Sequence, residues 1–162
     1  LAPEVLNQME GLPMTLKQVR IDALLSSGGQ PTEADIAALK AQGVTTIINL
    51  RRPGEQSQPL DPVTQGEVVR RAGLAYVHIP VDPKNLDPSQ VDEVARAIEA
   101  GGHCYVHCGA GGRATTHALL SRAKAAGHSA DEVLAKAEAA GAPITDEGFK
   151  AFVRTVAGPG RK

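Results

Sequence analysis

Short runs of aliphatic and β-branched residues recur along the chain, and each is followed by a polar or glycine-rich loop. The run at 44–50, Val-Thr-Thr-Ile-Ile-Asn-Leu, is mostly apolar, which is typical of a strand covered on both faces. Similar runs lie at 21–25 and 75–80, and the centre of 103–108, Tyr105-Val106, also favours a strand. We predict a strand in each range, and we expect the first to end at the turn Ser26-Ser27-Gly28-Gly29-Gln30-Pro31.

Helical patterns separate these strands. Thr32 with Asp35 resembles a capping box, Asp87 resembles an N-cap that is followed by proline, and Ser129 begins another capping box. The predicted helices lie at 32–43, 63–72, 87–101, 113–126 and 129–141, and a last one carries apolar positions from 149 to 156.

Because strands alternate with helices, the sequence predicts a single α/β domain. Its central sheet should hold about four to five mainly parallel strands with helices on both faces. We place this domain at 20–157, after an irregular lead-in at 1–19 that includes a short helix, and before a disordered tail at 158–162.

Composition narrows the classes of function. The 162 residues suit one domain, and with 2% aromatic residues the core must be built mainly from Val, Leu, Ile and Ala. Lys+Arg 17 against Asp+Glu 18 gives a net charge of −1, which offers no electrostatic case for nucleic acid or a membrane surface. Any attraction for an acidic ligand must therefore be local.

The candidate chemistry lies where the strand at 103–108 ends. Cys108 is followed by a short loop, here called the anion loop, and then by Arg113 at the start of a helical pattern. The anion loop consists of Gly109, Ala110, Gly111 and Gly112. Glycines allow successive amides to turn toward an anion, and a helix N-terminus with a guanidinium favours negative charge. We expect this loop to lower the pKa of the Cys108 thiol and to bind an oxyanion; the alternative is a buried structural cysteine.

Two histidines and two cysteines lie within the six residues 103–108, which also suggests a metal site. On a strand, alternation places His103 and His107 on one face and Cys104 and Cys108 on the other, so we predict no metal. The two cysteine Cα atoms should be roughly 13 Å apart, too far for a disulfide. We expect Cys104 to be a buried thiol and His107 to support Cys108 through a backbone hydrogen bond; a plain core histidine is the alternative.

Charged residues follow two other predicted strands. Ligands of open α/β sheets bind at the carboxyl ends of the strands, so Arg51 or Arg52 is a candidate anion ligand, with a solvated arginine as the alternative. Asp82 is a candidate general acid for the leaving oxygen, and a turn aspartate is the alternative. Asp87 is a second candidate for the acid role, but its N-cap position already accounts for an aspartate there.

The chain begins Leu1-Ala2-Pro3-Glu4 without methionine, and it contains neither a signal-peptide core nor an apolar run as long as a transmembrane helix. We expect this to be the mature form of an exported protein, periplasmic or secreted; a cytoplasmic location is the alternative.

Several segments resemble the beta-lactamase hydrolase-like family of bacterial phosphatase-like domains, which is related to tyrosine and dual-specificity phosphatases. The resemblance covers roughly residues 20–145 and rests on Ser27-Gly28-Gly29-Gln30-Pro31-Thr32, Ile48-Asn49-Leu50-Arg51 with Glu55, Ala72-Gly73-Leu74-Ala75-Tyr76, Ile79-Pro80-Val81 and the stretch 105–116. Within that stretch, the run from His107 to Gly111 also resembles the loop of dual-specificity phosphatases. It implies a phosphatase-like domain without a cofactor. It also implies a cysteinyl-phosphate mechanism in which Cys108 is the nucleophile, Arg113 clamps the phosphate and Asp82 is the acid. The substrate would be a phosphorylated protein or a small phosphate ester.

Two features depart from the phosphatase pattern. Four residues separate Cys108 from Arg113, whereas tyrosine and dual-specificity phosphatases have five. The shorter loop is associated with rhodanese sulfurtransferases, although the resembled family usually shows it too, as C-x-x-G-x-R. Ala114 stands where the family usually has Ser or Thr, whose hydroxyl would stabilise the departing thiolate. We therefore expect slow turnover unless Thr115 or Thr116 takes that role.

Three hypotheses follow. The first is a cysteine-dependent phosphatase that acts on phosphotyrosine or a small phosphate ester. The second is a sulfurtransferase that carries a persulfide on Cys108. The third is an oxyanion-binding domain with little turnover.

Overall fold

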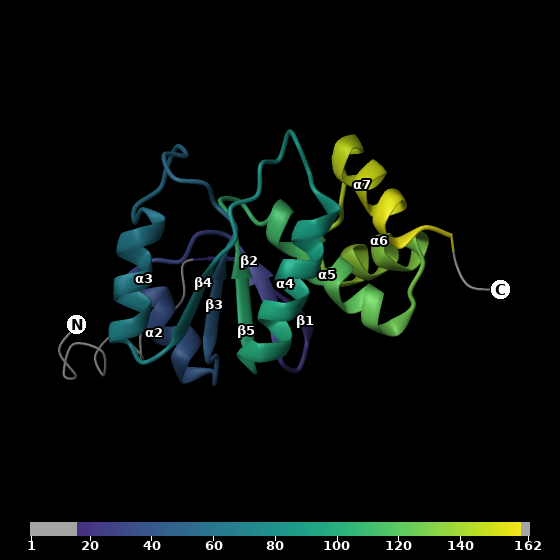
Figure 1. Cartoon of the computed structure of the whole chain (residues 1–162). Helices are drawn as coiled ribbons and strands as arrows, with labels where there is room; N and C mark the ends of the chain where they lie inside the picture. Colours follow the sequence, from purple (N-terminus) through teal and green to yellow (C-terminus); the bar gives the residue numbers. More distant parts are fainter. Residues whose placement is uncertain (1–15, 160–162) are drawn as a thin grey trace.

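The computed structural model describes residues 16–159, and its centre is a five-stranded sheet (Figure 1). The strands are β1 (Gln18–Asp22), β2 (Leu25–Gly28), β3 (Thr46–Asn49), β4 (Ala75–His78) and β5 (Cys104–His107). They lie in the order β1-β2-β5-β3-β4, and every neighbouring pair is parallel except β1 with β2. The prediction of an α/β domain with a mainly parallel sheet is confirmed.

Helices cover both faces of this sheet. They are α2 (Glu33–Ala41), α3 (Pro62–Arg71), α4 (Pro88–Gly101), α5 (Gly112–Ala126), α6 (Ala130–Ala139) and α7 (Glu147–Ala157). In Figure 1, α2 and α3 lie on one face, α4 and α5 lie on the other, and α6 and α7 pack outside α5. The predicted caps at Thr32, Asp87 and Ser129 are all present. None of the helices in the described range is long and apolar enough to cross a bilayer.

The prediction of one strand at 21–25 is wrong. The chain reverses at residues 23–24, where Asp22 Oδ1 accepts a hydrogen bond from Leu24 N at 2.9 Å, and β1 and β2 form an antiparallel pair. Ser26 and Ser27, assigned to a turn from sequence, lie buried inside β2. Their hydroxyls are satisfied by Gln18 and Thr115, contacts that local propensity cannot reveal.

The predicted lead-in and tail are described only in part. Residues 1–15, including the short helix expected there, and residues 160–162 lie outside the described residues. Residues 18–19 of the predicted lead-in belong to β1.

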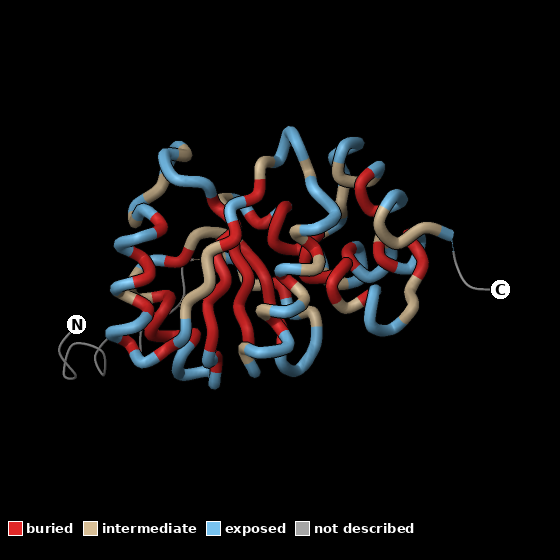
Figure 2. Tube along the Cα trace, viewed as in Figure 1, coloured by how far each residue is buried: buried red, intermediate tan, exposed pale blue. Residues whose placement is uncertain are grey.

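The sheet interior is almost fully buried, as the red trace through the strands in Figure 2 shows. All residues of β2, β3 and β5 are buried. One apolar cluster fills the α4/α5 side and another the α2/α3 side. Because β2 to β5 are parallel, the loops that follow them meet at one edge of the sheet, which is where the candidate site is found.

Candidate active site

Cys108 is the first residue after β5, and it is 2% exposed. The backbone N–H of Gly111 donates a hydrogen bond to its Sγ atom at 3.1 Å. Gly111 is the N-cap of α5 with a φ of 114°, a left-handed conformation that residues with a Cβ disfavour. The anion loop therefore turns an amide toward the sulfur at a helix N-terminus, where the helix dipole favours negative charge.

The Gly28-Gly29-Gln30 segment, which begins at the last residue of β2, contacts the anion loop and Cys108. Gln30 N donates to Gly109 O at 3.1 Å, and Cys108 N donates to Gly28 O at 3.3 Å. A Cβ on Gly29 would lie 2.9 Å from Gly109 O, so any larger residue would push the two segments apart. This segment is thus a support for the loop, a role that sequence reasoning did not assign.

Arg113 lies in the first turn of α5 and is 9% exposed. Its Nη1 and Nη2 atoms each donate to one Glu55 carboxylate oxygen at 2.7 Å, and Nη1 also donates to Val81 O at 2.9 Å. These bonds use three of the five N–H groups of a guanidinium. The other two, on Nε and Nη2, share one edge, which is the arrangement that binds two oxygens of a phosphate.

The charge of Arg113 is secured by its neighbours. The hydrogen bond to Glu55 raises the pKa of Arg113 against the effect of burial, and the adjacent Cys108 raises it further. A permanently charged guanidinium therefore lies beside the sulfur.

Glu55, in the loop after β3, is the carboxylate that orients Arg113. It also accepts hydrogen bonds from Arg51 Nε at 3.1 Å and from Arg52 N at 2.6 Å. The bond from Arg113, more than any other contact, lowers the pKa of Glu55 from 4.5 to about 2, although burial acts in the opposite direction. Sequence reasoning gave Glu55 no role; the available signal was an acidic residue just after an arginine pair at a strand end.

Arg51, the predicted anion ligand, lies beneath the anion loop. It is 3% exposed, and its guanidinium is 3.6 Å from the position a Gly109 Cβ would occupy. It donates to Glu55, to Gln30 Oε1 at 2.9 Å and to two loop carbonyls. These bonds connect the loop after β3 to the Gly28-Gly29-Gln30 segment. Direct contact between Arg51 and a ligand stays a prediction.

Asp82 directly follows Val81, whose carbonyl binds Arg113, so it reaches the same edge of the sheet as the anion loop. Its carboxylate accepts from Lys84 N at 2.9 Å and lies 3.7 Å from Arg52 Nη1. Its side chain is 38% exposed. Asp87 accepts from Ser89 N at 2.9 Å and caps α4, as expected. The general-acid role of Asp82 stays a prediction.

His107 is fully buried and links the Cys108 backbone to α3. Its Nδ1 lies 3.2 Å from Cys108 O and its Nε2 lies 2.8 Å from Gln65 Oε1. Burial lowers the pKa of His107 to about 3, so the ring is neutral and carries one N–H. Gln65 Nε2 is buried without a partner. The opposite amide orientation, with the Gln65 NH₂ donating to the ring, therefore satisfies both histidine nitrogens.

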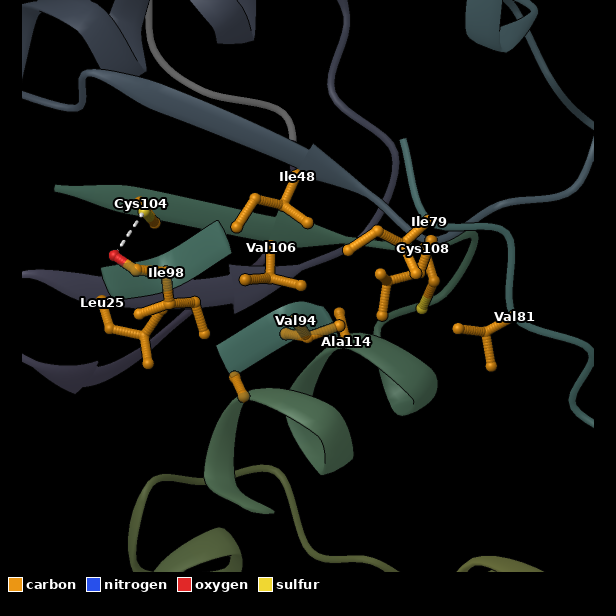
Figure 3. Close-up of a cluster of buried hydrophobic side chains, with 12 residues drawn as sticks. Leu25, Ile48, Ile79, Val81, Val94, Ile98, Cys104, Val106, Cys108 and Ala114 are labelled. Atoms are coloured by element: carbon orange, nitrogen blue, oxygen red, sulfur yellow. Dashed lines mark hydrogen bonds between the residues drawn. The ribbon is translucent and has the colours of Figure 1, made fainter. Parts of the chain in front are cut away.

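Ala114 packs in the apolar cluster that also holds Cys108 and Val81 (Figure 3). The Thr115 hydroxyl shares a 2.8 Å hydrogen bond with Ser27, and Thr116 Oγ1 is buried without a partner. Within the described residues, neither hydroxyl is bonded to Cys108. The role expected of Thr115 and Thr116 in place of the missing hydroxyl thus stays a prediction.

Cys104 is a buried free thiol, as predicted, and Cys108, which we expected to be the reactive cysteine, is also buried and free. Burial raises the pKa of Cys104 to about 11, which keeps it a thiol at neutral pH. Residues 16–159 contain no group of three or more His, Cys, Asp or Glu side chains that could hold a metal ion.

Sequence comparisons find relatives over most of the chain. Residues 19–126 match the family described as beta-lactamase hydrolase-like protein, phosphatase-like domain. The beta-lactamase hydrolase-like protein of Agrobacterium fabrum is 34% identical over 109 residues, and that of Xylella fastidiosa Temecula1 is 35% identical over 128 residues. These matches cover 67% and 78% of this chain but 25% and 30% of the relatives, so the chain spans less than a third of their length.

Structural comparisons find the same fold in phosphatases. A proposed phosphatase of Shewanella putrefaciens, assigned to DUF442, is 26% identical with a TM-score of 0.73 over 96% of this chain and 99% of its own. A proposed phosphatase of Neisseria meningitidis is 27% identical with a TM-score of 0.71 over 85% of this chain and 96% of its own. Pseudomonas aeruginosa TpbA shares the fold at 19% identity and a TM-score of 0.69, over 87% and 85% of the two chains. The chain therefore belongs to the beta-lactamase hydrolase-like family, as a copy of its phosphatase-like domain.

Proposed function

We propose that this domain is a cysteine-dependent phosphatase that hydrolyses a phosphate monoester through a cysteinyl-phosphate on Cys108. The surroundings of the sulfur carry this proposal: Gly111 N lies 3.1 Å from the Cys108 Sγ atom and donates to it, and the Arg113 guanidinium lies beside the sulfur in the first turn of α5. Membership of a phosphatase-like family supports phosphate over other oxyanions.

In the first chemical step the Cys108 thiolate attacks phosphorus. The S–P bond forms while the P–O ester bond breaks, and the electron pair of that bond passes to the leaving oxygen. The loop amides and Arg113 stabilise the charge on the three other phosphoryl oxygens. In the second step water attacks phosphorus, the S–P bond breaks, and inorganic phosphate and the thiolate are released.

Asp82 supplies the proton that the leaving oxygen needs and recovers a proton from the attacking water. Its place next to Val81 supports this role, because Val81 O already contacts the Arg113 guanidinium. To act as an acid, the carboxyl must leave the 3.7 Å contact with Arg52 and become protonated. Asp82→Asn is therefore expected to slow alkyl phosphates at least about tenfold more than activated aryl phosphates. Equal slowing of both classes would remove Asp82 from the acid role.

The nucleophile is tested by comparing the two cysteines. Cys108→Ser should lower phosphate release about a thousandfold or more, whereas Cys104→Ser, which alters a buried thiol on the same strand, should retain most activity. Rapid acid quenching with an aryl phosphate should trap one phosphoryl group on Cys108. Phosphate release that survives Cys108→Ser would overturn the proposal.

The same preparations separate the rival functions. Thiocyanate formed from thiosulfate and cyanide would favour a persulfide carrier, an idea that now rests on the four-residue loop alone. Phosphate binding without turnover would favour an oxyanion-binding domain. Phosphotyrosine is a natural first substrate, because the structural neighbour TpbA has been crystallised with it.

A further inference from the structure

A cavity of about 350 Å³ adjoins the anion loop on the side of β1 and the α6–α7 connection. The anion loop contributes Ala110, Gly111 and Gly112, and the opposite wall consists of 141–146 with Phe149. Cys108 and Arg113 do not line this space. The cavity therefore adjoins the anion loop itself and lies next to the Cys108 and Arg113 side chains without including them.

The lining offers a ligand mainly apolar surface. Its apolar side chains come from Val19, Ala142, Pro143, Ile144 and Phe149. Among the described residues that line it, the one cation is Lys17, whose Nζ donates to Gly141 O at 3.1 Å. The one carboxylate is Asp146, which caps α7 by accepting from Phe149 N at 2.9 Å. A ligand with several phosphates needs several cations, so a lining with a single cation disfavours a ligand of that kind.

Phe149 is the aromatic side chain that remains available to a ligand. The chain has two Tyr and two Phe residues. Tyr76 and Tyr105 donate to the carbonyls of Pro62 and Gly29, and Phe152 is buried against His117. Phe149 lines the cavity instead, with its ring 3.2 Å from the position a Gly112 Cβ would occupy. The ring thus lies directly against the rim of the anion loop.

We infer that this cavity binds the alcohol part of the substrate, that this part is an apolar and preferably aromatic group, and that Phe149 and Ile144 set the preference. The inference rests on the proposed function, because it takes the anion loop as the phosphate site. A single phosphate with an aryl group fits the lining, since an aromatic ring pairs with Phe149 while the lone cation is already engaged.

The test compares two substrates with activated leaving groups, one with a ring and one without. Phe149→Ala should lower kcat/KM for 4-nitrophenyl phosphate about tenfold, mainly through KM, and change that for acetyl phosphate less than about twofold. Val63→Ala, which truncates an apolar residue that is 74% exposed on α3, is the matched control and should change neither. Phe149→Leu keeps the bulk against Gly112 and should show an intermediate loss for the aryl ester alone.

Equilibrium binding keeps this test independent of turnover. Phenylphosphonate and methylphosphonate cannot be hydrolysed, and calorimetry should show that Phe149→Ala weakens only the phenyl compound. Equal weakening of both, or of neither, would overturn the inference even if Cys108→Ser abolishes catalysis. Conversely, the protein could lack phosphatase activity while Phe149→Ala weakens binding of phenylphosphonate alone. That result would support the aromatic subsite and contradict the proposed function.

Discussion

Glu55 determines where the Arg113 guanidinium points. Glu55→Gln keeps the size of the side chain but removes the charge that accepts both Arg113 bonds, so we expect kcat/KM to fall about 10- to 100-fold. Glu147→Gln, on an exposed carboxylate paired with Lys150, should leave activity unchanged. Steady-state kinetics on both variants measure the difference, and equal activities would show that Glu55 does not orient Arg113.

The lowered pKa of Glu55 also predicts a pH-dependent stability difference. A carboxylate whose folded pKa is about 2 and whose ordinary pKa is 4.5 stabilises the fold above about pH 4.5 and loses that effect as pH falls through about 2. The neutral amide introduced by Glu55→Gln lacks this effect at every pH. The gap in unfolding free energy between Glu55→Gln and the original protein should therefore close on acidification from pH 5 toward pH 2.

Ala114 leaves the sulfur without a hydroxyl donor at the position after Arg113. Ala114→Ser adds one oxygen inside the cluster that holds Cys108, and its hydroxyl would stabilise the thiolate as it departs from phosphorus. We expect kcat to rise about three- to tenfold. Ala118→Ser, one turn later in the same buried cluster, should lower stability without raising kcat. Burst kinetics would show faster dephosphorylation only for Ala114→Ser.

The two ends of α5 allow backbone strain to be separated from loss of function. Gly111 begins the helix with a φ of 114° and Gly127 ends it with a φ of 73°, so an alanine at either site destabilises the fold by about 1–2 kcal/mol. Only Gly111→Ala should abolish phosphate binding, because only Gly111 directs its amide at Cys108. Urea unfolding and phosphate titration measure the two effects, and equal phosphate affinities would mean that the amide direction is unimportant.

Buried histidines make the whole molecule sensitive to mild acid. Burial lowers the pKa of both His107 and His117, so both rings bind a proton less readily in the folded state than in the unfolded chain. The unfolded chain binds their protons below about pH 6.5, and stability should fall as pH decreases from 6.5 toward 5. The lowered pKa of Glu55 acts only at lower pH, which isolates the histidines in this window. Urea unfolding at half-unit pH steps measures how the free energy of unfolding changes with pH. A free energy that stays constant between pH 6.5 and 5 would contradict the lowered pKa of the two histidines.

Local signals predicted most of the elements. Short runs of β-branched, apolar and aromatic residues predicted β3, β4 and β5, and the caps at Thr32, Asp87 and Ser129 predicted three helix starts. Both signals act over a few neighbouring residues. The β1–β2 pair was missed because its buried serines are satisfied by residues distant in sequence. From local sequence alone, Ser26 and Ser27 favour a turn, because their hydrogen-bond partners become known only in the folded structure.

The sequence alone predicted the site from Cys108 to Arg113, because the candidate nucleophile, the loop amides and the guanidinium lie within six consecutive residues. The parts that hold this group in place come from far along the chain: Glu55 lies 58 residues from Arg113, and Gln65 lies 42 residues from His107. The cavity beside the loop likewise needs β1, α5 and the α6–α7 connection together. Local spacing determined which groups could do the chemistry, whereas packing of distant segments decided which carboxylate binds the arginine and which ring lines the cavity beside the loop.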